Sequence, residues 1–468
     1  MTTVPSLDLP PGVEPRAYQF AALDGARAAV RAGDRPVIVA PTGSGKTTCG
    51  AMVAFSAVRR GSPVLWIAHR RELLFQAKER LGQFGLRCGL ILAGFEPDPQ
   101  APVQIAGIDT LRRRELPPAR VVVLDEAHRA RARTVEAVLK HYEGTGAALL
   151  AMTATPARGD GKGLAPLFTA LVETVTGDDL RASGVLVPIR AYAPDVPDMR
   201  DVAVGVNGDY DDSQSAGVMV HLTGSIIDQW QKKAAGRKTL VFACTIEHSK
   251  LLRDRFLAAG IKAEHVDGTT PDDERAGIFQ RLQSGETTVV SNVGVCTEGL
   301  DLPSLEAIVF ARPTKSITLF LQSVGRGVRS SPGKDSCTLL DHAGNCLRLG
   351  HPEDPRVWTL EGVEQQQKKK DQKEGALCPQ CTRVRKSGEA TCPCGYEWPL
   401  SERREIEETD EDLAEVQRKP VATMAEKRTA YAEFVRVSKA RGWKIGWARH
   451  RYREQFGVWP SRMKELEV

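Results

Sequence analysis

The chain has 468 residues, with 41% hydrophobic and 26% charged residues and a formal net charge of +5. This is the composition of an ordinary folded protein, and the length predicts two to four domains. No apolar run reaches the ~18 residues that a membrane span needs, and the first residues lack the basic-then-apolar order of a signal peptide. We therefore expect a cytoplasmic protein with no membrane partner, whose charge permits nucleic-acid binding without requiring it.

Short apolar runs alternate with helix-like stretches in two separate parts of the chain. In the first part we predict strands over residues 37–40, 64–68, 121–124 and 147–152. The pattern restarts after residue 224, with strands predicted over 239–243, 289–290, 307–310 and 338–340. Continuous apolar strands are typical of parallel sheets covered on both faces, so we predict an α/β fold with two tandem parallel-sheet domains.

Shifts in composition predict the domain limits. We predict a first α/β domain over 1–190, followed by a connector rich in Pro, Gly and Asp over 191–224 and a second α/β domain over 225–355. A Gln/Lys linker is predicted over 356–377, a small cysteine-rich segment over 378–400, and an acidic linker with a basic-aromatic helical module over 401–468.

A glycine-rich turn follows the first predicted strand and precedes a helical stretch. Glycines let backbone N–H groups wrap phosphates, and the N-terminus of the helix adds positive potential. Lys46 is predicted to reach the β- and γ-phosphates of ATP, and the Thr47 hydroxyl to bind Mg²⁺. A plain turn before a helix is the alternative. The predicted nucleotide contacts in this turn are Thr42, Gly43, Ser44, Gly45, Lys46, Thr47 and Thr48.

An acidic pair, Asp125-Glu126, ends the predicted strand over 121–124. Ligands of open α/β sheets bind at the carboxyl ends of strands. Asp125 is predicted to hold the Mg²⁺ shell, and Glu126 to position or deprotonate the attacking water. An acidic surface pair at a helix start is the alternative, and the glycine-rich turn about 80 residues earlier argues against it.

Together these motifs resemble the superfamily 2 helicases of the DEAH-containing type, above all XPB-like and phage or prophage helicases, from about residue 16 to 329. The resemblance implies two RecA-like domains that hydrolyse ATP between them and act on nucleic acid. It implies adenine recognition by Arg16 and Gln19, and coupling of the two sites by His128, Thr153 and Thr155. It also implies nucleic-acid contacts by Arg70, Arg71, Thr110, Thr245 and Thr297, and nucleotide contacts by Gly299, Asp301 and Gln322.

Two arginines of the second domain, Arg326 and Arg329, occupy the place of the last helicase motif. Transfer of the γ-phosphoryl group needs cations on the developing charge, and an arginine supplied across a cleft ties hydrolysis to closure of that cleft. We predict this role for both side chains. An exposed basic helix is the alternative.

The ten cysteines fall into a scattered group and a tight cluster. The cluster, Cys378, Cys381, Cys392 and Cys394, is predicted to bind a structural Zn²⁺ through four thiolates. Its second pair is Cys-x-Cys, one residue shorter than the usual spacing, and free thiols are the alternative. The scattered cysteines are expected to be reduced and inert.

The last part of the chain, residues 421–468, carries 11 Lys/Arg against 5 Asp/Glu, interleaved with aromatic residues. Such residues can stack on bases and neutralise phosphates, or they can form a small helical core that contacts protein partners. For the whole chain we predict an ATP-dependent helicase or translocase, with DNA favoured over RNA. The alternatives are a duplex translocase or annealing motor that does not separate strands, a catalytically dead binding scaffold, and the motor part of a restriction system.

Overall fold

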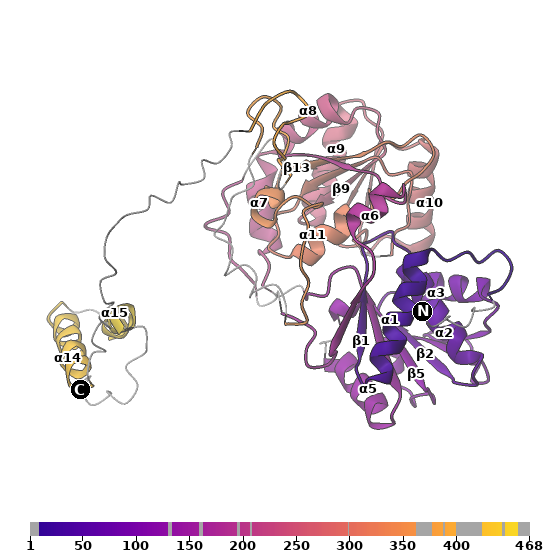
Figure 1. Cartoon of the computed structure of the whole chain (residues 1–468). Coiled ribbons are helices and arrows are strands. Elements are labelled where there is room, and N and C mark those ends of the chain that lie inside the picture. The colour runs from indigo at the N-terminus through magenta and orange to yellow at the C-terminus, as the bar shows by residue number, and fades with distance from the viewer. Residues whose placement is uncertain are drawn as a thin grey trace, which may run out of the picture. The chain divides into compact units, whose positions relative to one another are not determined.

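The computed structural model describes residues 9–129, 133–158, 162–193, 197–205, 208–297, 299–361, 377–386, 389–398, 424–441 and 445–456. They belong to two compact units, residues 1–400 and 401–468. The larger unit contains two α/β lobes, each built on one parallel sheet (Figure 1). None of the helices within the described ranges combines the length and the apolar character needed to cross a membrane.

Lobe 1 is built on a seven-stranded sheet with the order β3-β4-β2-β5-β6-β1-β7. All of its strand pairs are parallel. The strands are β1 (Pro36–Val39), β2 (Val64–Ala68), β3 (Cys88–Ile91), β4 (Val103–Gly107), β5 (Val121–Asp125), β6 (Ala148–Thr153) and β7 (Ala170–Glu173). The helices are α1 (Ala17–Arg31), α2 (Lys46–Val58), α3 (Arg71–Gln83), α4 (Ile108–Leu111), η1 (Ala127–Arg129) and α5 (Arg133–Gly144).

Lobe 2 is built on a six-stranded parallel sheet with the order β10-β11-β9-β12-β13-β8. Its strands are β8 (Ile189–Tyr192), β9 (Thr239–Ala243), β10 (Ala263–Val266), β11 (Val289–Asn292), β12 (Ala307–Ala311) and β13 (Cys337–Asp341). Its helices are α7 (Asp212–Val220), α8 (Thr223–Lys233), α9 (Ile246–Ala258), α10 (Asp272–Ser284), α11 (Ile317–Val324) and α12 (Asn345–Leu349), and α6 (Gly177–Ala182) precedes β8.

Each sheet is apolar on both faces because its strands alternate between two core clusters. In β1, Ile38 packs into one cluster while Val37 and Val39 pack into the other. In β9, Leu240 and Val241 divide in the same way between the two clusters of lobe 2. Burying such a side chain stabilises the fold by roughly 1.5–3 kcal/mol, which explains why these strands read as continuous apolar runs.

Three observations bear on the predicted domain limits. Strand β8 belongs to the sheet of lobe 2, so the predicted limit at residue 190 falls inside a strand, and we now propose a limit before Ile189. The predicted connector contains α7, whose Met219 is buried in a core cluster of lobe 2. Leu360, within the predicted linker, is buried in a core cluster of lobe 1, and most of that linker lies outside the described residues. The remaining limits stay predictions.

The cysteine-containing segment is attached to the edge of the sheet in lobe 2. Val384 N–H donates to the Ala191 carbonyl at 2.9 Å, and Ala193 N–H donates to the Thr382 carbonyl at 3.3 Å. Tyr192 and Arg383 form an antiparallel bridge between the two segments. Residues 382–384 therefore continue the sheet beyond β8.

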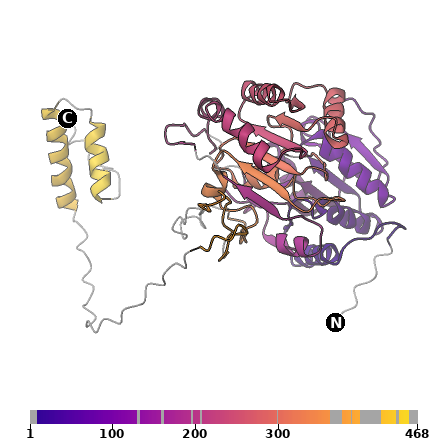
Figure 2. The same ribbon diagram turned by 90° about the horizontal axis from the view of Figure 1, so that it is seen from above.

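The smaller unit is a pair of helices, α14 (Met424–Ala440) and α15 (Gly446–Phe456), which lie side by side (Figure 2). Its core is formed by Tyr431, Val435, Ala448 and Tyr452, and the two tyrosine rings are 5.4 Å apart. The tail aromatics were predicted either to stack on bases or to form a small helical core. Tyr431 and Tyr452 form such a core.

Candidate active site

The glycine-rich turn needs glycine for both conformation and space. Gly43 and Gly45 have φ angles of 87° and 81°, in the left-handed region that favours glycine. A Cβ atom on Gly45 would lie 2.6 Å from Gln19 Nε2. Helix α2 begins directly after this turn, at Lys46, so its first backbone N–H groups face the turn.

Two groups in the turn fit the phosphates of a nucleotide. Ser44 Oγ is buried, and no group in the described part of the chain bonds to it. Lys46 is half-buried; desolvation lowers the pKa of its ammonium group, while the negative charges of Glu126 and Asp125 raise it. The turn thus offers an unpartnered hydroxyl, a half-buried amine and a helix N-terminus, the groups that bind ATP phosphates.

Gln19 is bonded to the backbone of the glycine-rich turn. Its amide Nε2 donates to the Ser44 carbonyl at 3.1 Å, and its Oε1 accepts from Arg16 N–H at 2.9 Å. Tyr18 Oη also donates to the Ser44 carbonyl, at 2.6 Å. Tyr18 was not among the predicted site residues, although its place next to Gln19 in the sequence could have indicated a contact with the turn. Adenine recognition by Arg16 and Gln19 stays a prediction.

The acidic pair lies at the carboxyl end of β5 and is held in a strained turn. Glu126 is a non-glycine residue with φ of 55°, a conformation that persists only when the surroundings enforce it. Its N–H donates to Asp125 Oδ1 at 3.0 Å. Burial, and then the neighbouring Glu126 charge, raise the pKa of Asp125. Two buried carboxylates beside Lys46 form a centre that a divalent cation would neutralise.

Lobe 2 reaches this acidic centre through helix α11. Gln322 Nε2 lies 3.5 Å from Glu126 Oε2 and 3.3 Å from His128 Nδ1. His128 Nδ1 is itself 3.4 Å from Glu126 Oε2. Gln322 therefore meets the acidic pair and the histidine together, although the sequence placed it only among the nucleotide contacts.

The predicted coupling loop, with Thr153 and Thr155, also contacts α11. Thr153 Oγ1 donates to the Thr155 carbonyl at 2.9 Å. Among the described residues Thr155 Oγ1 has no hydrogen-bond partner, although it is buried. Thr318 of α11 donates to the Ala157 carbonyl at 2.8 Å. The loop thus lies between the acidic centre and lobe 2.

The two arginines of lobe 2 face the glycine-rich turn. A Cβ atom on Gly43 would lie 3.3 Å from Arg329 Cγ, and one on Gly325 would lie 2.6 Å from Thr42 Cβ. Arg326 is 6% exposed, and the charges of both arginines contribute to the lowered pKa of Lys46. The structure therefore brings Arg329 and Gly325, the residue before Arg326, against the glycine-rich turn.

Both arginines are held by the loop that follows β11. Arg326 Nε donates to the Thr297 carbonyl at 3.0 Å, and its Nη1 donates to the Leu300 carbonyl at 2.9 Å. Arg329 forms an ion pair with Asp301. Gly299, in the same loop, accepts from Gln76 Nε2 of lobe 1 at 2.6 Å.

The residues predicted to contact nucleic acid are spread over both lobes. Arg70 donates to the carbonyls of Gly294 at 3.0 Å and Val295 at 3.3 Å, and so contacts lobe 2. Thr245 caps helix α9, where its hydroxyl accepts from His248 N–H at 3.2 Å, and Thr297 is buried. Thr110 lies in α4. Their roles toward nucleic acid stay predictions, as does that of Arg71.

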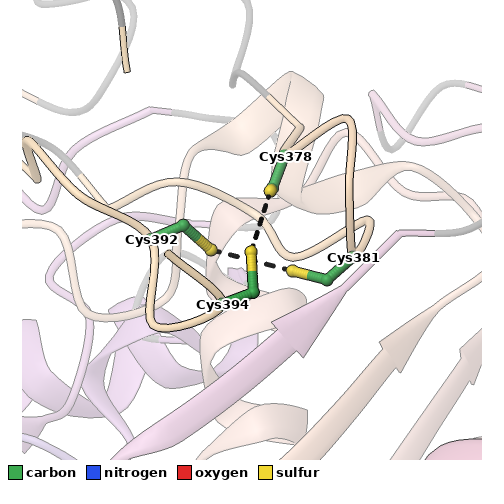
Figure 3. Close-up of side chains that lie close together, drawn as sticks. All are labelled: Cys378, Cys381, Cys392 and Cys394. Atoms are coloured by element: carbon green, nitrogen blue, oxygen red, sulfur yellow. Dashed lines mark hydrogen bonds between the residues drawn. The ribbon is translucent and has the colours of Figure 1, made fainter. Parts of the chain in front are cut away.

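The four clustered cysteines converge on one point, despite the short spacing of the second pair (Figure 3). Their sulfur atoms all lie within 4.8 Å of one another. Cys378 Sγ is 3.5 Å from Cys394 Sγ, and Cys381 Sγ is 3.7 Å from Cys392 Sγ. A tetrahedral site with metal–sulfur bonds of about 2.3 Å needs sulfur atoms roughly 3.8 Å apart, so the cluster could hold a metal ion.

Comparison with known proteins agrees with this geometry. Residues 12–158 match the family model "Type III restriction enzyme, res subunit", and residues 219–331 match "Helicase conserved C-terminal domain". A 51.5 kDa protein of Lactococcus phage (isolate 7-9) is 28% identical over 390 residues, which is 82% of this chain and 83% of the phage protein. A Saccharomyces cerevisiae protein named as an ATP-dependent helicase, IRC3, is 27% identical over 70% of this chain and 51% of its own length.

The fold is also that of a solved restriction enzyme. The ATP-dependent Type ISP restriction-modification enzyme LlaBIII, bound to DNA, matches 70% of this chain and 28% of its own chain, with a TM-score of 0.55 and 18% identity. The two matched family models, one in each lobe, and the relative named as a helicase define a helicase-family, ATP-dependent nucleic-acid motor. The chain belongs to the superfamily 2 helicases.

Proposed function

We propose that the chain is a DNA helicase or translocase that hydrolyses ATP at the interface of its two lobes, with each lobe supplying half of the catalytic centre. The observation that carries the proposal is the contact of Arg329 with Gly43 of the glycine-rich turn, which Arg329 follows by about 280 residues. Gly325, next to Arg326, lies against Thr42 of the same turn. A binding scaffold would gain nothing from burying the Arg326 cation at this interface.

We assign the phosphate-side roles to lobe 1. Lys46 and the N-terminus of α2 would bind the β- and γ-phosphates, and Thr47 with Asp125 would hold Mg²⁺. Glu126 would orient or deprotonate the attacking water, with Gln322 and His128 positioning its carboxylate. Mg²⁺ supplies the positive charge that neutralises the phosphates. Its attraction would lower the pKa of Asp125, which burial raises in this structure.

Lobe 2 would complete the centre when ATP is bound. Arg326 and Arg329 would stabilise the charge that develops on the transferred phosphoryl group. Once phosphate leaves, the interaction that holds the lobes together weakens and the lobes can separate. Because both lobes carry predicted nucleic-acid contacts, separation would change the spacing of those contacts along the strand.

We propose DNA as the track and Zn²⁺ as the ion of the cysteine cluster. LlaBIII, which has the same two-lobed fold, was solved with DNA. Four cysteine ligands leave no open coordination position, so the zinc would be structural. The chain spans about half the length of its yeast relative, so the wider activities of such relatives are proposals for this chain as well.

The test is the ATPase rate of the purified chain with single-stranded DNA, duplex DNA, forked DNA and RNA. We expect stimulation by DNA, no activity for Lys46→Ala, and a loss of roughly 10³-fold for Arg326→Ala. Arg200→Ala is a matched control, because Arg200 is 87% exposed at its side chain and lies far along the chain from both motifs. Full activity of Arg326→Ala would contradict the shared centre, and stimulation by duplex alone would favour a duplex translocase.

A further inference from the structure

An aromatic pair with an arginine lies beside the predicted nucleic-acid contacts of lobe 1. Strands β3, β4 and β2 are consecutive in the sheet, so their carboxyl ends share one edge. Phe95 follows β3, and Phe75 lies in the first turns of α3, which follows β2. A Cβ atom on Gly107, at the end of β4, would lie 3.3 Å from Leu92 Cδ1 and 3.4 Å from Leu74 Cδ1. The three connections therefore pack together at this edge.

The two rings, which we call the platform, meet edge to face with an angle of 61° between their planes, and part of the Phe75 ring is exposed. Their centroids are 5.6 Å apart, and Phe95 packs against the core of lobe 1. Phe75 is 37% exposed, and it belongs to the few large apolar side chains exposed within the described residues. The Arg71 guanidinium lies 5.6 Å from the Phe75 ring centre and 5.3 Å from that of Phe95.

The loop that presents Phe95 is anchored at its far end. Gln104 Nε2 donates to the carbonyls of Asp98 at 2.8 Å and Ala101 at 3.0 Å. Arg87 donates to both carboxylate oxygens of Asp98, at 2.8 and 2.6 Å. A ring held by an anchored loop loses little conformational entropy when a ligand stacks on it.

Exposed arginines lie at the platform and elsewhere on the same edge of the sheet. Arg71 is exposed, and the turn after α4, on the same edge of the sheet, carries the exposed residues Arg112, Arg113 and Arg114. Of these three, Arg112 is 3.8 Å from the Asp109 carboxylate. An exposed aromatic ring among cations suits a strand whose bases are unstacked and whose phosphates are negative.

We propose that Phe75, supported by Phe95 and Arg71, stacks on a base of single-stranded nucleic acid. This inference rests on the proposed function and deepens it, because a paired base inside a duplex cannot stack on a side chain. Arg71 would neutralise the phosphate of the stacked nucleotide. Nucleic acid bound at the platform would therefore be single-stranded at this point. This favours a motor that separates strands over one that moves along an intact duplex.

The full chain and its Phe75→Leu variant should be titrated with a single-stranded oligonucleotide that contains 2-aminopurine, with the matching duplex, and with single-stranded RNA. Leucine keeps apolar area and removes the ring. We expect the affinity for both single strands to fall by roughly 5- to 150-fold, with loss of the 2-aminopurine fluorescence change and unchanged duplex binding. Phe75→Trp should restore single-strand affinity.

Leu257→Ala is the matched control, because Leu257 is 48% exposed and lies in lobe 2. Equal single-strand affinity of the wild type and Phe75→Leu would overturn the platform while leaving the proposed function intact, provided that DNA still stimulates the wild-type ATPase. A wild type that hydrolyses no ATP with any nucleic acid would overturn the proposed function itself. Similar losses for single strands and duplex would also contradict base stacking.

Discussion

At the scale of single residues, Gln322 of lobe 2 makes polar contacts with the acidic centre of lobe 1. It is 2% exposed, and its neutral amide meets Glu126 and His128 without adding charge to a centre that already contains two carboxylates. A positive side chain there would form a competing ion pair with Glu126, whereas an amide can donate a hydrogen bond and leave the carboxylate basic. We infer that Gln322 is a positioning residue that orients Glu126 when the lobes meet.

We therefore expect Gln322→Leu to lower kcat by roughly 5- to 150-fold, because a buried carboxylate that loses a donor costs about 1–3 kcal/mol. Nucleic-acid affinity and ATP binding should change little, which separates positioning from general damage to the fold. Gln283→Leu, at an exposed position in α10 of the same lobe, is the control. The measurement is steady-state ATPase with saturating DNA. A KM effect without a kcat effect would contradict the assigned role.

At the scale of elements, the cysteine-containing segment protects an open sheet edge. Without residues 382–384, β8 would present unpaired backbone groups, which favour association with other chains. A buried glutamate reinforces the attachment: Glu353 accepts from Ile189 N–H of β8 at 2.8 Å and pairs with Lys386 of the cysteine-containing segment. The cysteine cluster and the sheet of lobe 2 are therefore parts of one structure.

Removing the metal should consequently destabilise lobe 2. We expect metal analysis to find a single zinc ion per chain, and we expect chelation or Cys392→Ser to lower the melting temperature by several degrees and increase aggregation. Cys88→Ser, a half-buried cysteine outside the cluster, should leave both the zinc content and the melting temperature unchanged. Zinc-free protein with wild-type stability would contradict this prediction.

At the scale of the whole molecule, the lobes are joined by contacts that do not involve the nucleotide. Glu72 of α3 forms an ion pair with Arg275 of α10, with 3.1 Å between Glu72 Oε1 and Arg275 Nη1. Gln76, one turn along α3, donates to Gly299. Arg70 also contacts lobe 2. These contacts favour the arrangement in which the lobes touch. They therefore reduce the free energy that ATP binding must supply to bring the lobes together.

Reversal of one charge in this pair should open the lobes, and reversal of both should restore closure. We expect Glu72→Lys to raise the KM for ATP by a few fold, since a partly exposed ion pair contributes about 0–1 kcal/mol and like charges repel. Adding Arg275→Glu to Glu72→Lys should recover most of the loss. The comparison of KM among the single and double variants measures the coupling. Additive effects in the double variant would show that this pair does not contribute to closure.

Local pattern was sufficient to predict the central strands. Strands β1, β2, β5, β6, β9, β11, β12 and β13 each contain a buried apolar run, and each was predicted. Strands β3, β4, β7, β8 and β10 were not: β10, for example, reads Ala263-Glu-His-Val, where polar residues interrupt the apolar run. Such short strands form because a neighbouring strand supplies their hydrogen bonds, which is a tertiary effect.

The sequence by itself determined the α/β class, the glycine-rich turn, the acidic pair and the cysteine cluster, because each depends on neighbours a few residues apart. Only the tertiary structure decided what lies across the lobe interface: Gln322 beside Glu126, Arg329 against Gly43, and Arg70 bonded to the loop after β11. It also decided that residues 382–384 extend the sheet from β8. These contacts join segments up to hundreds of residues apart, and their geometry follows from how the two sheets pack rather than from any local pattern.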